Sequence, residues 1–192
     1  MQRSNRHRPP ERMIALAIQP APAASDPRAP FGFGAFIITA RGRNEASFEC
    51  HMHGYGAGYP PHAMCERLQG LFTPETLALI YHQAEDFGSQ ARRSRDPSRA
   101  EIMKSIPRSG LRTAQLAAIP HHILKHAGGV GGLQLSSRYS TPLGRLGYLG
   151  AEAQAVWVYW LFRRCTPSVR RQLLSSYQAW QVIENARRKV IA

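Results

Sequence analysis

Two apolar segments separated by a short polar turn constrain the fold of this chain more than any other feature. The segments are Phe33–Ala40 and Ala46–Met52, and the turn between them reads Arg41-Gly42-Arg43-Asn44. From Ala46 to Met52, apolar and polar residues alternate strictly, which is typical of a strand with one face in a core. The pattern predicts an antiparallel β-hairpin, and the apolar segment Met13–Ile18 predicts a third strand beside it.

The C-terminal part of the chain carries helical patterns instead. Residues Ala151–Cys165 are rich in Val, Trp and Tyr, and Thr166-Pro167-Ser168 is a typical start signal for a new helix. Beyond it, apolar residues recur at helical spacing, namely Val169, Leu173, Tyr177, Trp180 and Ile183. We therefore predict an α+β fold, with a small N-terminal antiparallel sheet followed by a mainly helical C-terminal half that ends in a helical hairpin.

Three further helices are expected between these regions. Thr73-Pro74-Glu75 resembles a capped helix start, and apolar residues follow it at helical spacing as far as Phe87. Shorter helices are predicted at Ala100–Ser105 and Leu111–Ile119, limited by Pro107 and Pro120. The segment Gly110–Ala117 also suits the first helix of a helix-turn-helix, although Pro120 and Gly128 leave little room for a recognition helix.

The length of 192 residues fits one main domain with tails. Residues 1–12 are expected to form a disordered basic arm, and residues 13–127 an α+β region. A glycine-rich hinge is expected at Gly128-Gly129-Val130-Gly131-Gly132. Residues 133–192 are expected to be the C-terminal helical region. The hinge lacks the Lys-Ser/Thr pair of a phosphate-binding loop, which argues against nucleotide binding there.

The number of cysteines and the length of the apolar segments indicate the cellular compartment in which the protein is expected. The chain has three cysteines, Cys50, Cys65 and Cys165, and an odd number at wide spacing favours a reducing environment. The apolar segment near the N-terminus is shorter than the core of a signal peptide, and no apolar segment approaches the length of a membrane span. A cytoplasmic location without a membrane partner is therefore expected.

The charge balance gives the main functional hypothesis. The chain carries a formal net charge of +13, and 22 of its 25 basic residues are arginine. Arginine pairs with phosphate through two parallel hydrogen bonds, and neutralising phosphates releases counterions. We therefore expect a nucleic-acid-binding accessory or regulatory protein, with DNA or RNA as its partner. The arginine content could instead reflect genome composition. The expected phosphate-contacting residues are Arg92, Arg93, Arg95, Arg99, Arg163, Arg164, Arg170, Arg171, Arg187, Arg188 and Lys189.

Two other functions stay open at this point. The first is a protein-binding inhibitor or adaptor, such as a mobile-element factor that blocks a nucleic-acid machine by occupying its surface. A metal-dependent nuclease would need several carboxylates that converge on its metal ions. The candidates for that role are Glu45, Glu49, Glu66, Glu85 and Asp86. These acids are not assigned as catalytic residues, and whether the chain is an enzyme stays uncertain.

One group of residues has the composition of a zinc site. Cys50-x2-His53 is followed by His62-x2-Cys65, and two thiolates with two imidazoles could bind zinc tetrahedrally. The alternative is that Cys50 packs inside as a strand residue and that the histidines lie on a polar loop. A second group, His121, His122 and His126, is expected at the surface.

Overall fold

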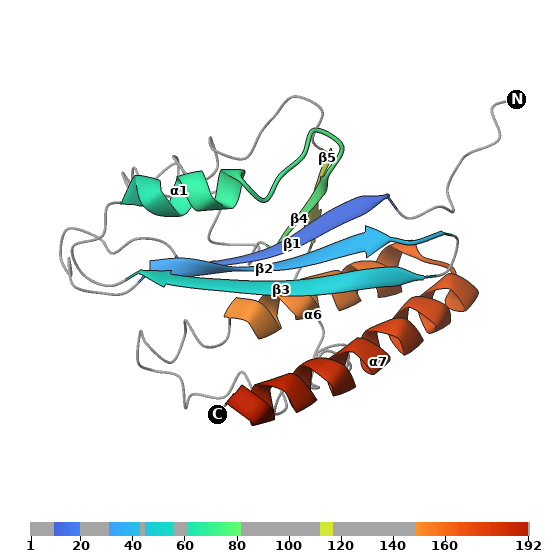
Figure 1. Cartoon of the computed structure of the whole chain (residues 1–192). Helices are drawn as coiled ribbons and strands as arrows, with labels where there is room; N and C mark the ends of the chain where they lie inside the picture. The colour runs from blue at the N-terminus through green and yellow to red at the C-terminus, as the bar shows by residue number, and fades with distance from the viewer. Residues whose placement is uncertain are drawn as a thin grey trace, which may run out of the picture.

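The computed structural model describes residues 10–19, 31–42, 45–55, 61–81, 112–116 and 149–191. These residues form a sheet with helices on both sides (Figure 1). The strands are β1 (Arg12–Gln19), β2 (Phe31–Ala40), β3 (Ala46–Tyr55), β4 (Leu77–Tyr81) and β5 (Arg112–Leu116). The helices are α1 (Pro61–Gln69), α6 (Leu149–Arg164) and α7 (Pro167–Ile191).

The sheet is mixed, and its strand order is β3-β2-β1-β4-β5. β1, β2 and β3 form an antiparallel meander, whereas β4 runs parallel to β1 and β5 parallel to β4. The hairpin between β2 and β3 closes where the amide of Arg41 donates to the carbonyl of Glu45 at 2.7 Å. Gly42 in this turn has a φ of 93°, a conformation that favours glycine.

Successive side chains along each strand point to opposite faces of the sheet, so the strand residues pack in two separate layers. On β1, Ile14 and Leu16 face α1, where they pack with Met64 and Leu68. The residues between them face the opposite side, where α6 and α7 lie (Figure 1). Each face of the sheet is therefore covered by at least one helix, and the predicted α+β class is confirmed.

The larger core lies between the sheet and the helical hairpin of α6 and α7. Its centre is aromatic, with Phe36 and Phe48 from adjacent strands stacked at 5.7 Å between ring centroids. Trp157 of α6 lies 5.2 Å from Tyr177 of α7, and both rings contact the two phenylalanines edge-on. Aromatic pairs in this arrangement are favourable beyond the apolar area that they bury.

A glycine allows α6 to approach the sheet closely. A Cβ atom at Gly34 of β2 would lie 2.1 Å from the carbonyl oxygen of Leu149, at the first residue of α6. A Cβ atom at Gly150 would lie 2.7 Å from the sulfur of Met52 on β3. The start of α6 therefore rests almost directly on the backbone of β2, and a side chain at Gly34 would prevent that contact.

A buried hydrogen-bond network joins the two helices of the hairpin. The hydroxyl of Tyr177 donates to Oε1 of Gln154 at 2.7 Å and accepts from Nε2 of Gln181 at 2.6 Å. Nε2 of Gln154 also donates to the carbonyl of Gly150 at 3.1 Å. Burial raises the pKa of the Tyr177 hydroxyl far above its usual range, so this group remains a donor.

The structure confirms the predicted elements with the strongest periodicity. The three N-terminal strands form at the expected places, and each is slightly longer than predicted. The two C-terminal helices also form, and they make the expected helical hairpin with Cys165 and Thr166 at the turn. The sheet contains two parallel strands in addition to the antiparallel ones that the sequence predicted.

The helix predicted to start at Thr73 is wrong. Thr73 to Thr76 form a turn, in which the amide of Thr76 donates to the carbonyl of Thr73, and Leu77–Tyr81 form β4. β4 lies between β1 and β5 in parallel pairing. A strand buried on both faces is apolar at every position, so its pattern cannot be distinguished from that of a buried helix.

The helix predicted at Leu111–Ile119 is also wrong, because Arg112–Leu116 form β5. The helix-turn-helix interpretation of this segment is therefore wrong as well. The segment is five residues long, too short for periodicity to separate a helix from a strand. Helix α1 was not predicted, although Pro61 at its first position and Met64 and Leu68 on its buried face were available signals.

Several predictions lie outside the described residues. These are the basic arm up to residue 9, the helix at Ala100–Ser105 and the hinge at 128–132. Among the described helices, none combines the length and the hydropathy that crossing a membrane requires.

Candidate nucleic-acid interface

Four of the predicted arginines are brought together where α6 ends and α7 begins. Arg163 and Arg164 are the last two residues of α6, and Arg170 and Arg171 lie in the first turns of α7. The two helices are separated by two residues, so all four belong to one corner of the helical hairpin (Figure 1). We call this group the arginine corner. Arg163, Arg164 and Arg171 are exposed, and Arg170 is half-buried.

Two of these side chains are held in place by aromatic rings. The guanidinium carbon of Arg170 lies 4.5 Å from the ring centroid of Phe162, and its Nη1 donates to the Phe162 carbonyl at 3.4 Å. Nε of Arg163 donates to the hydroxyl of Tyr159 at 3.1 Å. An arginine restrained in this way loses less side-chain entropy when it binds an anion.

Among the described residues, no carboxylate neutralises the arginine corner. No ion pair between described residues includes Arg163, Arg164, Arg170 or Arg171. The first turn of α7 contains no acidic residue, although the positive end of a helix dipole normally favours one. The first turn of α7 therefore supplies no carboxylate that could pair with Arg170 or Arg171.

The arginines at the other end of α7 form a separate site. From Arg171 to Arg187 the helix advances 16 residues, which corresponds to about 24 Å along its axis and a rotation of roughly 160°. Arg187 is exposed, but it lies on a different side of the helix. Arg188 and Lys189 belong to α7, and their side chains are not among those described. Arg92, Arg93, Arg95 and Arg99 lie outside the described residues.

The structure does not bring together the two zinc candidates whose side chains it describes. Cys50 faces the α6 side of the sheet, where its sulfur lies 3.7 Å from Nε2 of Gln154. His53 faces the opposite side, and its ring lies 5.0 Å from that of Phe33. His62 and Cys65 are in α1, and their side chains are not described. The zinc site therefore stays a prediction, and within the described part of the chain no three His, Cys, Asp or Glu residues form a metal-binding group.

The carboxylates considered for a nuclease do not converge among the described residues. Glu45 lies at the end of the β-hairpin, Glu49 on β3 and Glu66 on α1, and all three are exposed. Glu85, Asp86 and the His121 group lie outside the described residues.

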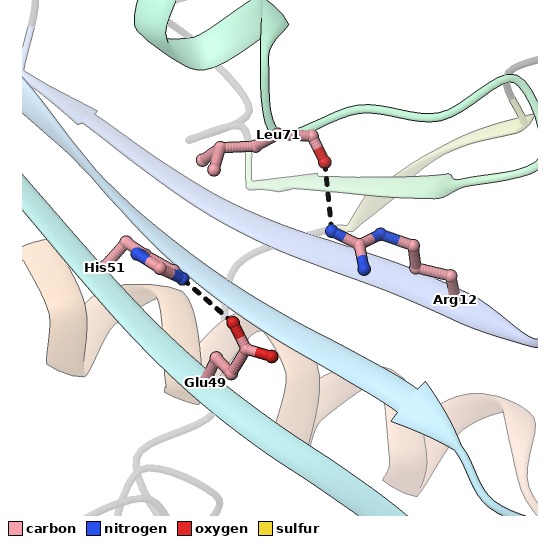
Figure 2. Close-up of polar contacts among 4 residues, drawn as sticks. All are labelled: Arg12, Glu49, His51 and Leu71. Atoms are coloured by element: carbon pink, nitrogen blue, oxygen red, sulfur yellow. Dashed lines mark hydrogen bonds and ion pairs between the residues drawn. The ribbon is translucent and has the colours of Figure 1, made fainter.

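The α1 side of β3 carries a small group of titratable side chains. Oε2 of Glu49 pairs with Nε2 of His51 at 3.2 Å, as Figure 2 shows. His53 follows on the same face, with its ring 6.4 Å from that of His51. Burial lowers the pKa of His53, and the positive charges of Arg67 and His51 lower it further.

Another arginine near this side of the sheet has a structural role. Nη2 of Arg12 donates to the carbonyl of Leu71 at 3.2 Å, which links the start of β1 to the segment after α1 (Figure 2). Its Nε is buried without a hydrogen-bond partner. Arg12 is thus part of the fold and is distinct from the exposed arginine corner.

No protein-family model matches this sequence, and no curated protein matches it either. Functional inference therefore rests on the geometry of the chain itself.

Proposed function

We propose that this protein is a nucleic-acid-binding accessory or regulatory protein that contacts phosphates through the arginine corner. The observation that carries the proposal is the gathering of Arg163, Arg164, Arg170 and Arg171 at one turn, without carboxylate partners among the described residues. The net charge of +13 adds a long-range attraction to any polyanion. Phosphate contacts of this kind position a protein on nucleic acid without reading its sequence.

The local geometry also supports phosphate as the ligand. Arg170 and Arg171 lie beside the N-terminal end of α7, where backbone amides and the helix dipole favour a negative group. The hydroxyls of Thr166 and Ser168, 3.3 Å apart at this end, are further hydrogen-bond donors. Arginine forks and a helix N-terminus would then bind neighbouring phosphates of one strand.

Fluorescence anisotropy with labelled DNA and RNA across a salt series tests the proposal. We expect the double variant Arg170→Gln, Arg171→Gln to bind more weakly than the natural protein. For duplex DNA, the slope of log affinity against log salt should become shallower by about two, because two phosphate contacts are lost. The measurement should be repeated with single-stranded DNA and RNA to identify the preferred nucleic acid.

The matched control removes two arginines elsewhere. Arg41 in the hairpin turn and Arg67 on α1 are exposed and lie on other elements, so Arg41→Gln, Arg67→Gln changes the net charge equally. If both double variants lose the same affinity and slope, binding depends on overall charge and the arginine corner is not the site. If the natural protein does not bind near physiological salt, the proposed function is wrong.

A further inference from the structure

Two guanidinium groups of the arginine corner lie over aromatic rings of α6. The guanidinium carbon of Arg170 is 4.5 Å from the ring centroid of Phe162, and that of Arg163 is 5.6 Å from the ring centroid of Tyr159. Both distances are within the range at which a cation is attracted to the face of an aromatic ring. Tyr159 and Phe162 are three residues apart on α6 and are therefore neighbours on its surface. The arginine corner thus contains two neighbouring guanidinium groups, each backed by a ring.

A hydrogen bond fixes each of these guanidinium groups as well. Nη1 of Arg170 donates to the carbonyl of Phe162 at 3.4 Å, and Nε of Arg163 donates to the hydroxyl of Tyr159 at 3.1 Å. A guanidinium carries five N–H groups in its plane, so one such bond leaves several donors for a phosphate. Arg163 is exposed, and Arg170 keeps part of its surface exposed although it lies over a ring. The face directed away from the ring is then the face on which a planar ligand can stack.

Phosphate binding alone does not require guanidinium planes that are held in this way. The attraction between a basic protein and nucleic acid depends on the number of charges, and a duplex carries more charge per unit length than a single strand. A stacking plane is useful only for a ligand whose planar groups are accessible. In a duplex, neighbouring bases cover both faces of each base, whereas unpaired bases can stack on aromatic rings or on arginine planes.

We propose that the arginine corner binds single-stranded nucleic acid in preference to duplex, because unpaired bases stack on the guanidinium faces of Arg163 and Arg170. Arg164 and Arg171, which are exposed at the same corner, would contact phosphates of the same strand. This inference rests on the proposed function and adds to it the class of nucleic acid and the role of the bases. Single-stranded DNA and single-stranded RNA present the same stacking chemistry, and the experiment distinguishes them.

Fluorescence anisotropy with strands that differ only in their bases tests the proposal on the full chain. The first probe is a labelled oligothymidylate of about twelve nucleotides, which is within the usual range of single-strand site sizes. The second probe has the same length and the same phosphates, but every base is absent. We expect the thymidine strand to bind at least about fivefold more tightly than the abasic strand near physiological salt. A duplex of the same length should also bind more weakly than the thymidine strand, and an oligouridylate gives the affinity for RNA.

A charge-conserving variant locates the stacking surface. Arg163→Lys, Arg170→Lys keeps both positive charges but removes both guanidinium planes. The affinity ratio between the thymidine and the abasic strand should therefore fall to about one. Loss of the arginine forks would weaken phosphate contacts with both strands alike and would leave this ratio unchanged.

The matched control makes the same replacement at two exposed arginines on other elements. Arg41→Lys, Arg67→Lys should keep the affinity ratio of the natural protein. A ratio that falls equally in both double variants would show that the bases are not bound at the arginine corner. Circular dichroism melting of each variant identifies any loss that comes from unfolding.

The possible failures of this proposal and of the proposed function give different results. Equal binding of the thymidine and abasic strands by the natural protein would show that phosphates alone are bound, and the preference for single strands would be wrong while the proposed function stands. Tighter binding of the duplex would overturn the preference in the same way. Absence of binding to every probe near physiological salt would overturn the proposed function and this inference together.

Discussion

The two faces of the sheet are covered in very different ways. On one side, α6 and α7 enclose a large aromatic core and a buried amide network, and they hold the arginine corner at their turn. On the other side, the nine-residue helix α1 packs Met64 and Leu68 on a smaller cluster, beside half-buried histidines. The comparison indicates that the C-terminal hairpin supplies most of the stability, whereas the α1 side contributes less and responds to pH.

The largest expected effect comes from the contact between α6 and β2. In Gly34→Ala, the new methyl group would meet the backbone of Leu149 at 2.1 Å, and backbone on both sides cannot yield as a side chain can. We expect the free energy of unfolding to fall by more than about 3 kcal/mol, measured by urea denaturation with circular dichroism.

Gly70→Ala is the matched control on the α1 side. The nearest atoms to a Cβ at Gly70 are 3.6 Å away, which is ordinary van der Waals contact. Its unfolding free energy should stay within about 1 kcal/mol of the natural value. Similar losses in the two variants would contradict the asymmetry between the faces.

An intermediate effect is expected from the buried network. Tyr177→Phe keeps the ring but removes the hydroxyl, so Oε1 of Gln154 loses the donor and Nε2 of Gln181 loses the acceptor that the hydroxyl provides. The unfolding free energy should fall by about 1–3 kcal/mol. Replacing both glutamines by Leu in the Phe variant should recover part of this loss, and an unchanged stability in Tyr177→Phe alone would show that the network contributes nothing.

The smallest effect concerns His53 on the α1 side. Its pKa in the folded protein is lowered from 6.5, so the unfolded chain binds more protons between the two values. Stability should therefore fall as the pH decreases below about 6.5 and stop falling, for this group, below the folded pKa. In His53→Gln, the dependence of the unfolding free energy on pH over this range should be weaker, as determined by denaturation at several pH values. An unchanged or steeper dependence would contradict the sign of the shift.

The way in which an element is buried affects how clearly its residue pattern identifies it. β3 has one face in the core and one face towards polar surroundings, so its alternation identified it directly. α7 has a polar side along its length, so its helical period was equally clear. β4 is apolar because consecutive residues on both of its faces, Leu77, Ala78 and Leu79, are buried, and the Thr73-Pro74 turn before it resembles a helix start.

The candidate site was predictable only in part. The proximity of Arg164 and Arg170 follows from two helices joined by a short turn, which the sequence indicated. The restraint of Arg170 by Phe162 is a contact between the two helices, and it could not be inferred from spacing along one of them.

The placement of the tryptophans makes the protein a selective optical reporter. All three tryptophans of the chain, Trp157, Trp160 and Trp180, belong to the helical hairpin. Intrinsic fluorescence therefore follows the hairpin side of the sheet, and loosening of α1 alone would leave the emission nearly unchanged. Trp157 and Trp160 are buried, whereas Trp180 is half-buried, so it should dominate quenching by a soluble agent such as acrylamide. A ligand that covers Trp180 would protect it from quenching, so the unlabelled protein reports the accessibility of this side chain.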